Sequence, residues 1–241
     1  MKILIVNDDS IHAPGIAVLA KAAMSLGEVW VVAPSHQCSA MSQKVTIRGS
    51  LTVERVKDFP VPVKAAYQVS GTPADCVKAA LLQLLDEKPD FVFSGINDGY
   101  NVGYDIAYSG TLGAAFEATM SGIPAIAFSC ESAAKLATAE RYIEDIAKDL
   151  VTKPLERGMV WNVNFPWVEP EDVKGILRDR TIAPMPLFNG WYETAEIDAN
   201  KTELLIRGIP KKAGDPVPEG TDLEAVLSGY ISIGKVKCVA L

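Results

Sequence analysis

The sequence predicts an α/β protein with a Rossmann-like, mostly parallel sheet, helices on both faces, and a C-terminal accessory arm of strands with one short helix. Through residues 1–153, short apolar runs alternate with helical patterns, which is the order expected of a parallel sheet packed between helices. After residue 153 prolines become frequent and the apolar runs are isolated. We therefore expect a Rossmann-like core over 1–153 and, over 154–241, an accessory region that packs on the core or is exchanged between copies of it.

The first elements are a strand, a helix and a second strand. Residues 2–6, "KILIV", are a continuous apolar run of the kind found in a central strand buried on both faces. The next segment has Pro14 near a first helical turn and Gly27 as a stop. Residues 28–33, "EVWVVA", form the second strand, and 34–43 are polar and irregular. The runs "KVTIRGSLTV" and "AYQVS" then indicate a side hairpin or extended arm.

The remaining core elements have clear boundary signals. Thr72 is expected to cap a helix, with Pro73 at its first position and Asp75 at its positive end. The strand "DFVFSG" follows, and then the glycine-rich segment "GINDGYNVGYDIAYSGT". A helix over 112–120, a strand "PAIAFS" and a helix containing Ile143 complete the core. In the accessory region, "TDLEAVLSG" has the spacing of a capped helix.

The composition excludes several classes of function. The 241 residues are 49% hydrophobic and 22% charged, as in an ordinary globular protein. The net charge of -7 argues against duplex nucleic acid and anionic membranes as partners. The four cysteines are far apart and form no C-x-x-C pair, so we expect reduced thiols in a cytoplasmic protein. We recognise neither a secretory leader nor an apolar run long enough to span a bilayer.

Polar side chains follow three of the predicted strands. Asp8 and Asp9 come directly after the first strand, Ser39 lies in the loop after the second, and Asn97 follows "FVFSG". Because the carboxyl ends of parallel strands meet at one sheet edge, these loops should converge there. Carboxylate, hydroxyl and amide oxygens suit Mg²⁺ or Mn²⁺. A cation would offset the repulsion between the adjacent acids, although such a pair can also cap a helix or form an Asx-turn.

The glycine-rich segment predicts a phosphate site. Ser109, Gly110 and Thr111 stand at the expected start of a helix, where amide groups and hydroxyls can bind an anion. The sequence lacks G-x-G-x-x-G, the P-loop pattern and G-x-S-x-G, which argues against a dinucleotide site, a nucleoside triphosphatase and a serine nucleophile. Of the two histidines, His12 is as consistent with a helix start as with catalysis, so its role is left open.

Six segments together resemble the SurE family, the metal-dependent nucleoside-monophosphate phosphatases also called survival proteins or stationary-phase 5'-nucleotidases. They occur in the family's order over essentially the whole chain: "ILIVNDDSIHAPGI", "VVAPSHQCSA", "GTPADCVKAAL", "SGINDGYNVGYDIAYSGTLGAAFEA", "WNVNFP" and "EGTDLEAVLSGYISI". The N-D-D and G-I-N-x-G-x-N-x-G-x-D-x-x-Y-S-G-T blocks are highly specific.

The resemblance implies a Rossmann-like core and a C-terminal arm exchanged in a homodimer, sometimes paired into a homotetramer. It implies one divalent ion per subunit, Mg²⁺ or Mn²⁺, held by Asp8, Asp9, Ser39 and Asn97, with the two aspartates catalytic. The implied phosphate-binding residues are Asn97, Asn101, Ser109, Gly110 and Thr111. Members typically hydrolyse nucleoside 5'- and 3'-monophosphates, and some also trim short polyphosphate.

One loop departs from the family pattern. Where A-P-D-R-N-R-S-G is common, residues 33–40 read "APSHQCSA", so an acid and two arginines are lost while Ser39 is kept. Because arginines are strong phosphate and base contacts, this change bears on substrate choice and turnover. Ser10 stands where glycine is usual after N-D-D.

Several alternatives remain open at this stage. In-line attack by water near the cation is the preferred mechanism, and an aspartyl-phosphate on Asp8 is the alternative. Rival functions are a nucleotide-binding stress protein with weak catalysis and a phosphatase of non-nucleotide phosphoesters or short polyphosphate. The accessory aromatics fit core or subunit-interface anchors better than base-stacking platforms: Trp161, Phe165, Trp167, Trp191 and Tyr192.

Overall fold

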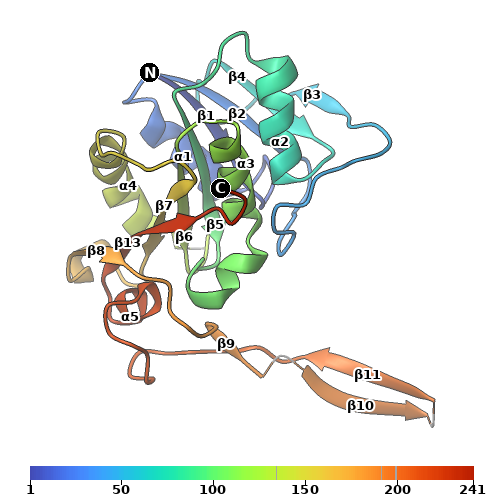
Figure 1. Cartoon of the computed structure of the whole chain (residues 1–241), viewed down its shortest axis with the longest axis vertical. Helices are drawn as coiled ribbons and strands as arrows, with labels where there is room; N and C mark the ends of the chain where they lie inside the picture. Colours follow the sequence, from blue (N-terminus) through green and yellow to red (C-terminus); the bar gives the residue numbers. More distant parts are fainter. Residues whose placement is uncertain (134, 191, 199) are drawn as a thin grey trace.

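A nine-stranded sheet forms the centre of the computed structural model, which describes residues 1–133, 135–190, 192–198 and 200–241 (Figure 1). The strand order is β3-β4-β2-β1-β5-β6-β7-β13-β8. The strands are β1 (Lys2–Val6), β2 (Glu28–Pro34), β3 (Val53–Arg55), β4 (Ala65–Val69), β5 (Phe91–Asp98), β6 (Ala125–Cys130), β7 (Met159–Phe165), β8 (Ile176–Arg180) and β13 (Ile231–Lys237). The run from β4 to β7 is parallel throughout, so the predicted α/β architecture is confirmed.

Helices cover both faces of this sheet (Figure 1). On one face α1 (Pro14–Ala23) packs on β1, α4 (Ala137–Leu150) packs on α1 and β7, and their buried side chains share one core cluster with Ile3 and Ile5 of β1. On the other face α2 (Pro73–Ala79) packs on β1 and β2, α3 (Gly110–Met120) packs on β5 and β6, and their buried side chains share a second core cluster with Leu4 and Val6. Because successive strand side chains point to opposite faces, the continuous apolar run of β1 serves both layers at once.

The helix starts follow the predicted local chemistry. The Asp75 backbone N–H donates to Thr72 Oγ1 at 3.2 Å, and the Thr72 N–H donates to the Asp75 carboxylate at 3.0 Å, which makes a capping box at α2. Thr221 accepts from the Glu224 N–H in the same way at α5 (Asp222–Leu227). Shorter helical segments are η1 (Ala80–Leu84), η2 (Gly103–Tyr108) and η3 (Pro170–Asp172).

The predicted side hairpin is shorter than the sequence pattern indicates. β3 pairs antiparallel with β4, as expected, but residues 44–50 form no strand. The Thr46 backbone N–H and hydroxyl both donate to the Asp75 carboxylate at the start of α2. This contact uses the backbone donor that a sheet ladder would need, so the β-branched run crosses the helix start instead.

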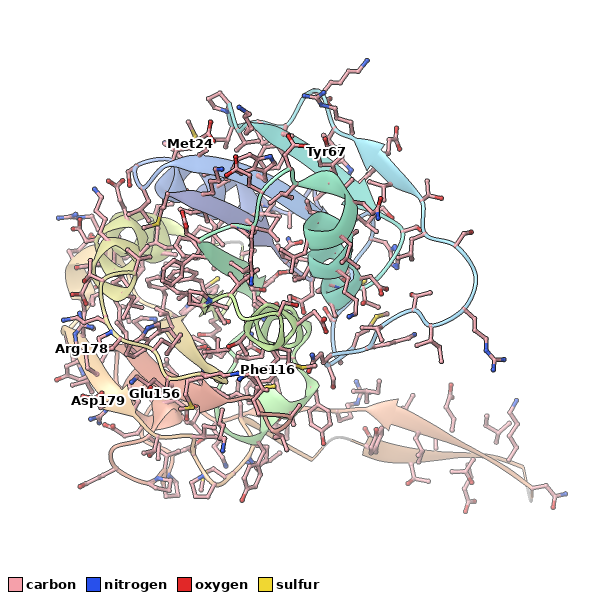
Figure 2. The ribbon with its side chains drawn as sticks, turned by 45° about the horizontal axis from the view of Figure 1, so that its top comes forward. Met24, Tyr67, Phe116, Glu156, Arg178 and Asp179 are labelled. Atoms are coloured by element: carbon pink, nitrogen blue, oxygen red, sulfur yellow. The ribbon has the colours of Figure 1, made fainter. Side chains whose placement is uncertain are left out.

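Part of the chain after residue 153 adds strands to the central sheet, and the rest lies outside that sheet. β7, β13 and β8 extend the sheet, with β13 antiparallel to β7. Figure 2 shows Arg178 and Asp179 of β8 toward one edge and Tyr67 of β4 toward the other. The division at residue 153 stays a prediction, and the sheet continues across it.

A separate hairpin stands off the body of the molecule (Figures 1 and 2). It consists of β10 (Tyr192–Asp198) and β11 (Lys201–Ile206), and at its base β9 (Phe188–Asn189) pairs with β12 (Ile209–Pro210). These elements match the expected accessory arm of strands. Of the helices within the described ranges, none combines the length and apolar character needed to cross a bilayer.

The accessory aromatics divide into two groups. Trp161 and Phe165 of β7 are buried in the core. Trp167 and Tyr192 are 45% and 65% exposed in the single chain, so they are not part of the hydrophobic core. Trp191 lies outside the described residues. An interface role for the exposed pair stays a prediction.

Candidate functional site

The sheet topology brings the predicted loops to one edge. β1 lies between β2 and β5, and the chain continues from β1 toward β2 before returning to β5 on the other side. Loops that leave neighbouring strands in opposite directions open a crevice at this switch point, where ligands bind in doubly wound folds. Asp8 and Asp9 follow β1 directly, and Asn97 lies at the end of β5.

Asp8 is the most buried of the four predicted cation ligands, with 3% of its surface exposed. Its Oδ1 accepts a 2.6 Å hydrogen bond from Thr111 Oγ1, and its backbone carbonyl accepts from the Cys38 N–H at 2.7 Å. Burial and, to a smaller extent, the Asp9 charge raise the pKa of Asp8 from 3.8 to about 7, against the opposing effect of Thr111. A carboxylate held in this way would gain strongly from a nearby positive charge.

Asp9 carries a carboxylate oxygen without a partner. Its Oδ2 accepts from the Asp98 backbone N–H at 2.8 Å, and the Gln37 side chain also binds the carboxylate. Its Oδ1 is buried and has no hydrogen-bond partner within the described part of the chain. Burial raises the pKa of Asp9, and the neighbouring Asp98 charge adds to this effect. A buried carboxylate oxygen normally has a partner, so Asp9 Oδ1 is suited to bind a cation or a hydrogen-bond donor at this corner.

Of the other two predicted cation ligands, Asn97 lies at the same corner as the aspartates and Ser39 does not. The Asn97 side-chain amide donates to the Gly99 carbonyl at 2.7 Å, which leaves its Oδ1 as the end of the amide suited to a cation. Asn97 also precedes Asp98, whose N–H binds Asp9. Ser39 is exposed in a turn, and no hydrogen bond among the described residues joins its hydroxyl to the other three. The structure therefore brings the two aspartates and Asn97 to one corner, and Ser39 only approaches it through its neighbour Cys38.

The start of α3 packs against Asp8. Ser109 caps the helix by accepting from the Leu112 N–H at 3.1 Å. A β-carbon at Gly110 would lie 2.8 Å from Asp8 Oδ2, so glycine is needed for this close approach. The Thr111 backbone N–H joins its hydroxyl in binding the carboxylate. The predicted anion site at this helix start is thus adjacent to Asp8, and part of it already serves Asp8.

Asn101 has a different position from the other candidates. Its Nδ2 donates to Ser129 Oγ at 2.8 Å, and its N–H donates to Asn164 Oδ1 at 2.9 Å. Its carbonyl accepts from the side chains of Asn162 and Asn164. These contacts fasten the glycine-rich loop to β6 and β7. Sequence reasoning missed the two β7 asparagines, although two polar residues alternating within the buried strand "WNVNF" are a signal that could have revealed them.

The donor set fits a hard divalent cation. His12 and His36 are exposed, and the described residues contain no group of three or more His, Cys, Asp or Glu side chains suited to a metal. A cation here would therefore depend on two carboxylates and neutral oxygens, which is the ligand chemistry of Mg²⁺ and Mn²⁺. The unpartnered Asp9 Oδ1 and the raised pKa of Asp8 both fit such an ion.

Comparisons with known proteins agree with this architecture. Residues 3–183 match the family model described as "Survival protein SurE". The chain is 38% identical to 5'-nucleotidase SurE of Parvibaculum lavamentivorans, covering 97% of this chain and 84% of the relative. It is 37% identical to 5'-nucleotidase SurE of Aeromonas hydrophila, with 97% and 90% covered. The crystal structure of the SurE protein from Aquifex aeolicus superposes with a TM-score of 0.85 at 34% identity, covering 100% of this chain and 95% of that one. By these likenesses and its N-D-D corner, the chain belongs to the SurE family.

Proposed function

We propose that this protein is a divalent-metal-dependent phosphatase that hydrolyses nucleoside 5'-monophosphates, and also 3'-monophosphates, to nucleoside and phosphate. The observation that carries the proposal is the pair of adjacent aspartates at this corner. Asp8 lies beside the start of α3, and Asp9 has a buried oxygen with no hydrogen-bond partner among the described residues. The curated relatives named 5'-nucleotidase SurE support the choice of substrate.

In this proposal Asp8, Asp9, Ser39 and Asn97 hold one Mg²⁺ or Mn²⁺ per subunit. When bound, such an ion neutralises phosphate charge and lowers the pKa of water. Asp9 Oδ1 is the group we assign to orient the attacking water and accept its proton, because it is unpartnered and its carboxyl has a raised pKa. Thr111 and the close approach of Gly110 hold Asp8 in place.

The phosphate is assigned to the start of α3. The Ser109 hydroxyl and the Gly110 backbone N–H offer donors next to Asp8, whereas the Ser109 N–H already donates to the Ile106 carbonyl and the Thr111 N–H serves Asp8. Asn97 lies near the end of β5, the strand that pairs with β1. Asn101 is a positioning residue in this arrangement, because its side-chain nitrogen is bonded to Ser129. An aspartyl-phosphate on Asp8 is the alternative route, and solvent oxygen entering the Asp8 carboxylate during turnover in labelled water would support it.

The test is phosphate release from a panel of mononucleotides and sugar phosphates, with Mn²⁺ or Mg²⁺ and with a chelator. We expect metal-dependent release from mononucleotides that Asp9→Asn abolishes. Asp145→Asn, a change at an exposed site on α4, is the matched control and should retain activity. Metal-dependent turnover by wild type that survives Asp9→Asn would contradict the assigned role.

Two further outcomes distinguish the rival functions. Nucleotide binding without turnover would favour a nucleotide-binding protein with weak catalysis. The atypical loop over 35–38 is the sequence feature that suggests this alternative. Faster release from sugar phosphates or short polyphosphate than from nucleotides would favour a phosphatase of other phosphoesters.

We also propose a homodimer or homotetramer built through the hairpin β10–β11. Apolar side chains on this hairpin are exposed in the single chain, including Leu204 at 56% and Ile206 at 73%. A second copy would cover them. Light scattering coupled to size-exclusion chromatography should give two or four subunits, and a monomer would count against the proposal. The cytoplasmic location stays a prediction from the dispersed cysteines.

A further inference from the structure

A cavity of about 520 Å³ lies beside the candidate site and has no role in the chemistry described so far. It opens beyond the carboxyl ends of β5, β6 and β7, between the glycine-rich loop and the accessory region. Gly99, Tyr100, Glu131 and Trp167 lie on the side of the three strand ends. Phe188, Lys211 and Lys212 come from the base of the hairpin.

The wall of this cavity adjoins the cation corner through Gly99. Gly99 lines the cavity, and its carbonyl accepts the 2.7 Å hydrogen bond from the Asn97 side chain. Two residues of extended chain span at most about 7 Å, so Asn97 and the cavity wall are close neighbours. A ligand with its phosphate at the corner is therefore within reach of this cavity.

Three aromatic side chains line the cavity. Tyr100 is buried, and its hydroxyl accepts from the Trp167 backbone N–H at 2.8 Å, which fixes the start of the loop after β7. The Trp167 ring is 45% exposed and lies 5.4 Å from the Lys135 ammonium. The sequence alone favours a core or interface role for Trp167, but an exposed indole on a cavity wall is also a surface on which a nucleobase can stack.

Opposite charges stand on different walls of the same cavity. The Glu131 carboxylate accepts a 3.4 Å hydrogen bond from the Tyr100 hydroxyl, while Lys211 and Lys212 come from the strand β12 side. Guanine carries N–H donors on its Watson–Crick edge and the O6 and N7 acceptors on its Hoogsteen edge. A carboxylate complements the first edge, and an ammonium complements the second. Adenine lacks both the N1–H donor and the O6 acceptor.

We propose that this cavity is the nucleobase subsite and that it selects guanine, with Trp167 as the stacking surface, Glu131 binding the N1–H and amino donors, and Lys211 or Lys212 binding O6 and N7. The proposal rests on the proposed phosphatase function and specifies its substrate. The preferred substrate is then guanosine 5'-monophosphate.

The first experiment compares kcat/KM for guanosine 5'-monophosphate, adenosine 5'-monophosphate and ribose 5-phosphate. We expect the guanine nucleotide to exceed the adenine nucleotide by about tenfold, because one well-placed bidentate pair discriminates by this order. Trp167→Ala should lower kcat/KM for both nucleotides by about tenfold and leave ribose 5-phosphate unchanged. Trp167→Phe keeps an aromatic ring and should recover most of the loss.

Glu131→Gln tests the selection itself. It should bring the guanine and adenine nucleotides to similar kcat/KM values, while ribose 5-phosphate is unaffected. The matched control is Glu156→Gln, which changes an exposed carboxylate paired with Lys235 and absent from the cavity lining. It should preserve the preference for guanine.

A binding measurement separates this inference from the phosphatase proposal. Calorimetry with guanosine, which has no phosphate, should show saturable binding that Trp167→Ala removes and Trp167→Phe keeps. Absence of guanosine binding, or equal kcat/KM for ribose 5-phosphate and both nucleotides, would refute the proposed nucleobase subsite. Either result would be compatible with the proposed phosphatase activity. Guanosine binding without phosphate release from any substrate would support the subsite and refute the phosphatase.

Discussion

Replacing Asp8 by asparagine should stabilise the metal-free protein while abolishing its proposed activity. The substitution keeps the shape of the side chain and an oxygen that can accept the 2.6 Å hydrogen bond from Thr111. It removes a negative charge from a side chain that is only 3% exposed and adjoins Asp9. The folded protein therefore no longer has to bury that charge.

The magnitude follows from the pKa of Asp8. Burial, together with the adjacent Asp9 charge, raises this pKa from 3.8 to about 7, and each pH unit corresponds to 1.36 kcal/mol, so the stabilisation approaches about 4 kcal/mol above pH 7. Because the folded pKa lies above the unfolded value, the wild type is favoured in acid and loses stability as the pH rises from 3.8 to about 7. The advantage of Asp8→Asn should accordingly shrink as the pH falls.

Urea unfolding in the presence of a chelator measures this difference at about pH 8.5 and about pH 5. Adding Mn²⁺ gives a second readout, since a ligand that binds only the folded state stabilises it by about 2.7 kcal/mol at one hundred times its Kd. Wild type should gain this stability and Asp8→Asn should not. The reasoning is refuted if the variant is no more stable than wild type at about pH 8.5, or if the difference does not depend on pH.

Three other perturbations test the site and its supports. Gly110→Ala would place a methyl group 2.8 Å from Asp8 Oδ2. We expect the displaced carboxylate to lower kcat by about 100-fold. An unchanged kcat would contradict the importance of this contact. Thr72→Ala removes the α2 cap and should cost about 1 kcal/mol in urea unfolding, with the Mn²⁺ response kept. Burial alone would raise the pKa of Asp75, but hydrogen bonds from Thr46 and Thr72 outweigh this and lower it. The stabilisation by Asp75 is therefore present at neutral pH and lost as the pH falls below about 4, and Asp75→Asn should be less stable at neutral pH and lack this acid-side loss.

The local elements could be predicted from the sequence. The apolar run of β1 and the capping residues Thr72 and Thr221 indicated their elements correctly, because strand burial and helix caps depend on residues within a few positions of one another. The rule that ligand loops leave the carboxyl ends of parallel strands also placed Asp8, Asp9 and Asn97 at one edge.

The tertiary structure decided the contacts between distant segments. Thr111 binds Asp8 across 103 residues, and Asp222 of α5 accepts from the Gly103 N–H across 119. The bonding of Asn101 to β6 and β7, the exposed position of Ser39 and the cavity beside Trp167 depend on such contacts. Periodicity and capping describe which face of an element is buried and where it begins, but they carry no information on which distant segment covers that face. The sequence by itself therefore determined the elements and the edge of the sheet that carries the candidate residues, while the path of the folded chain determined which of those residues meet.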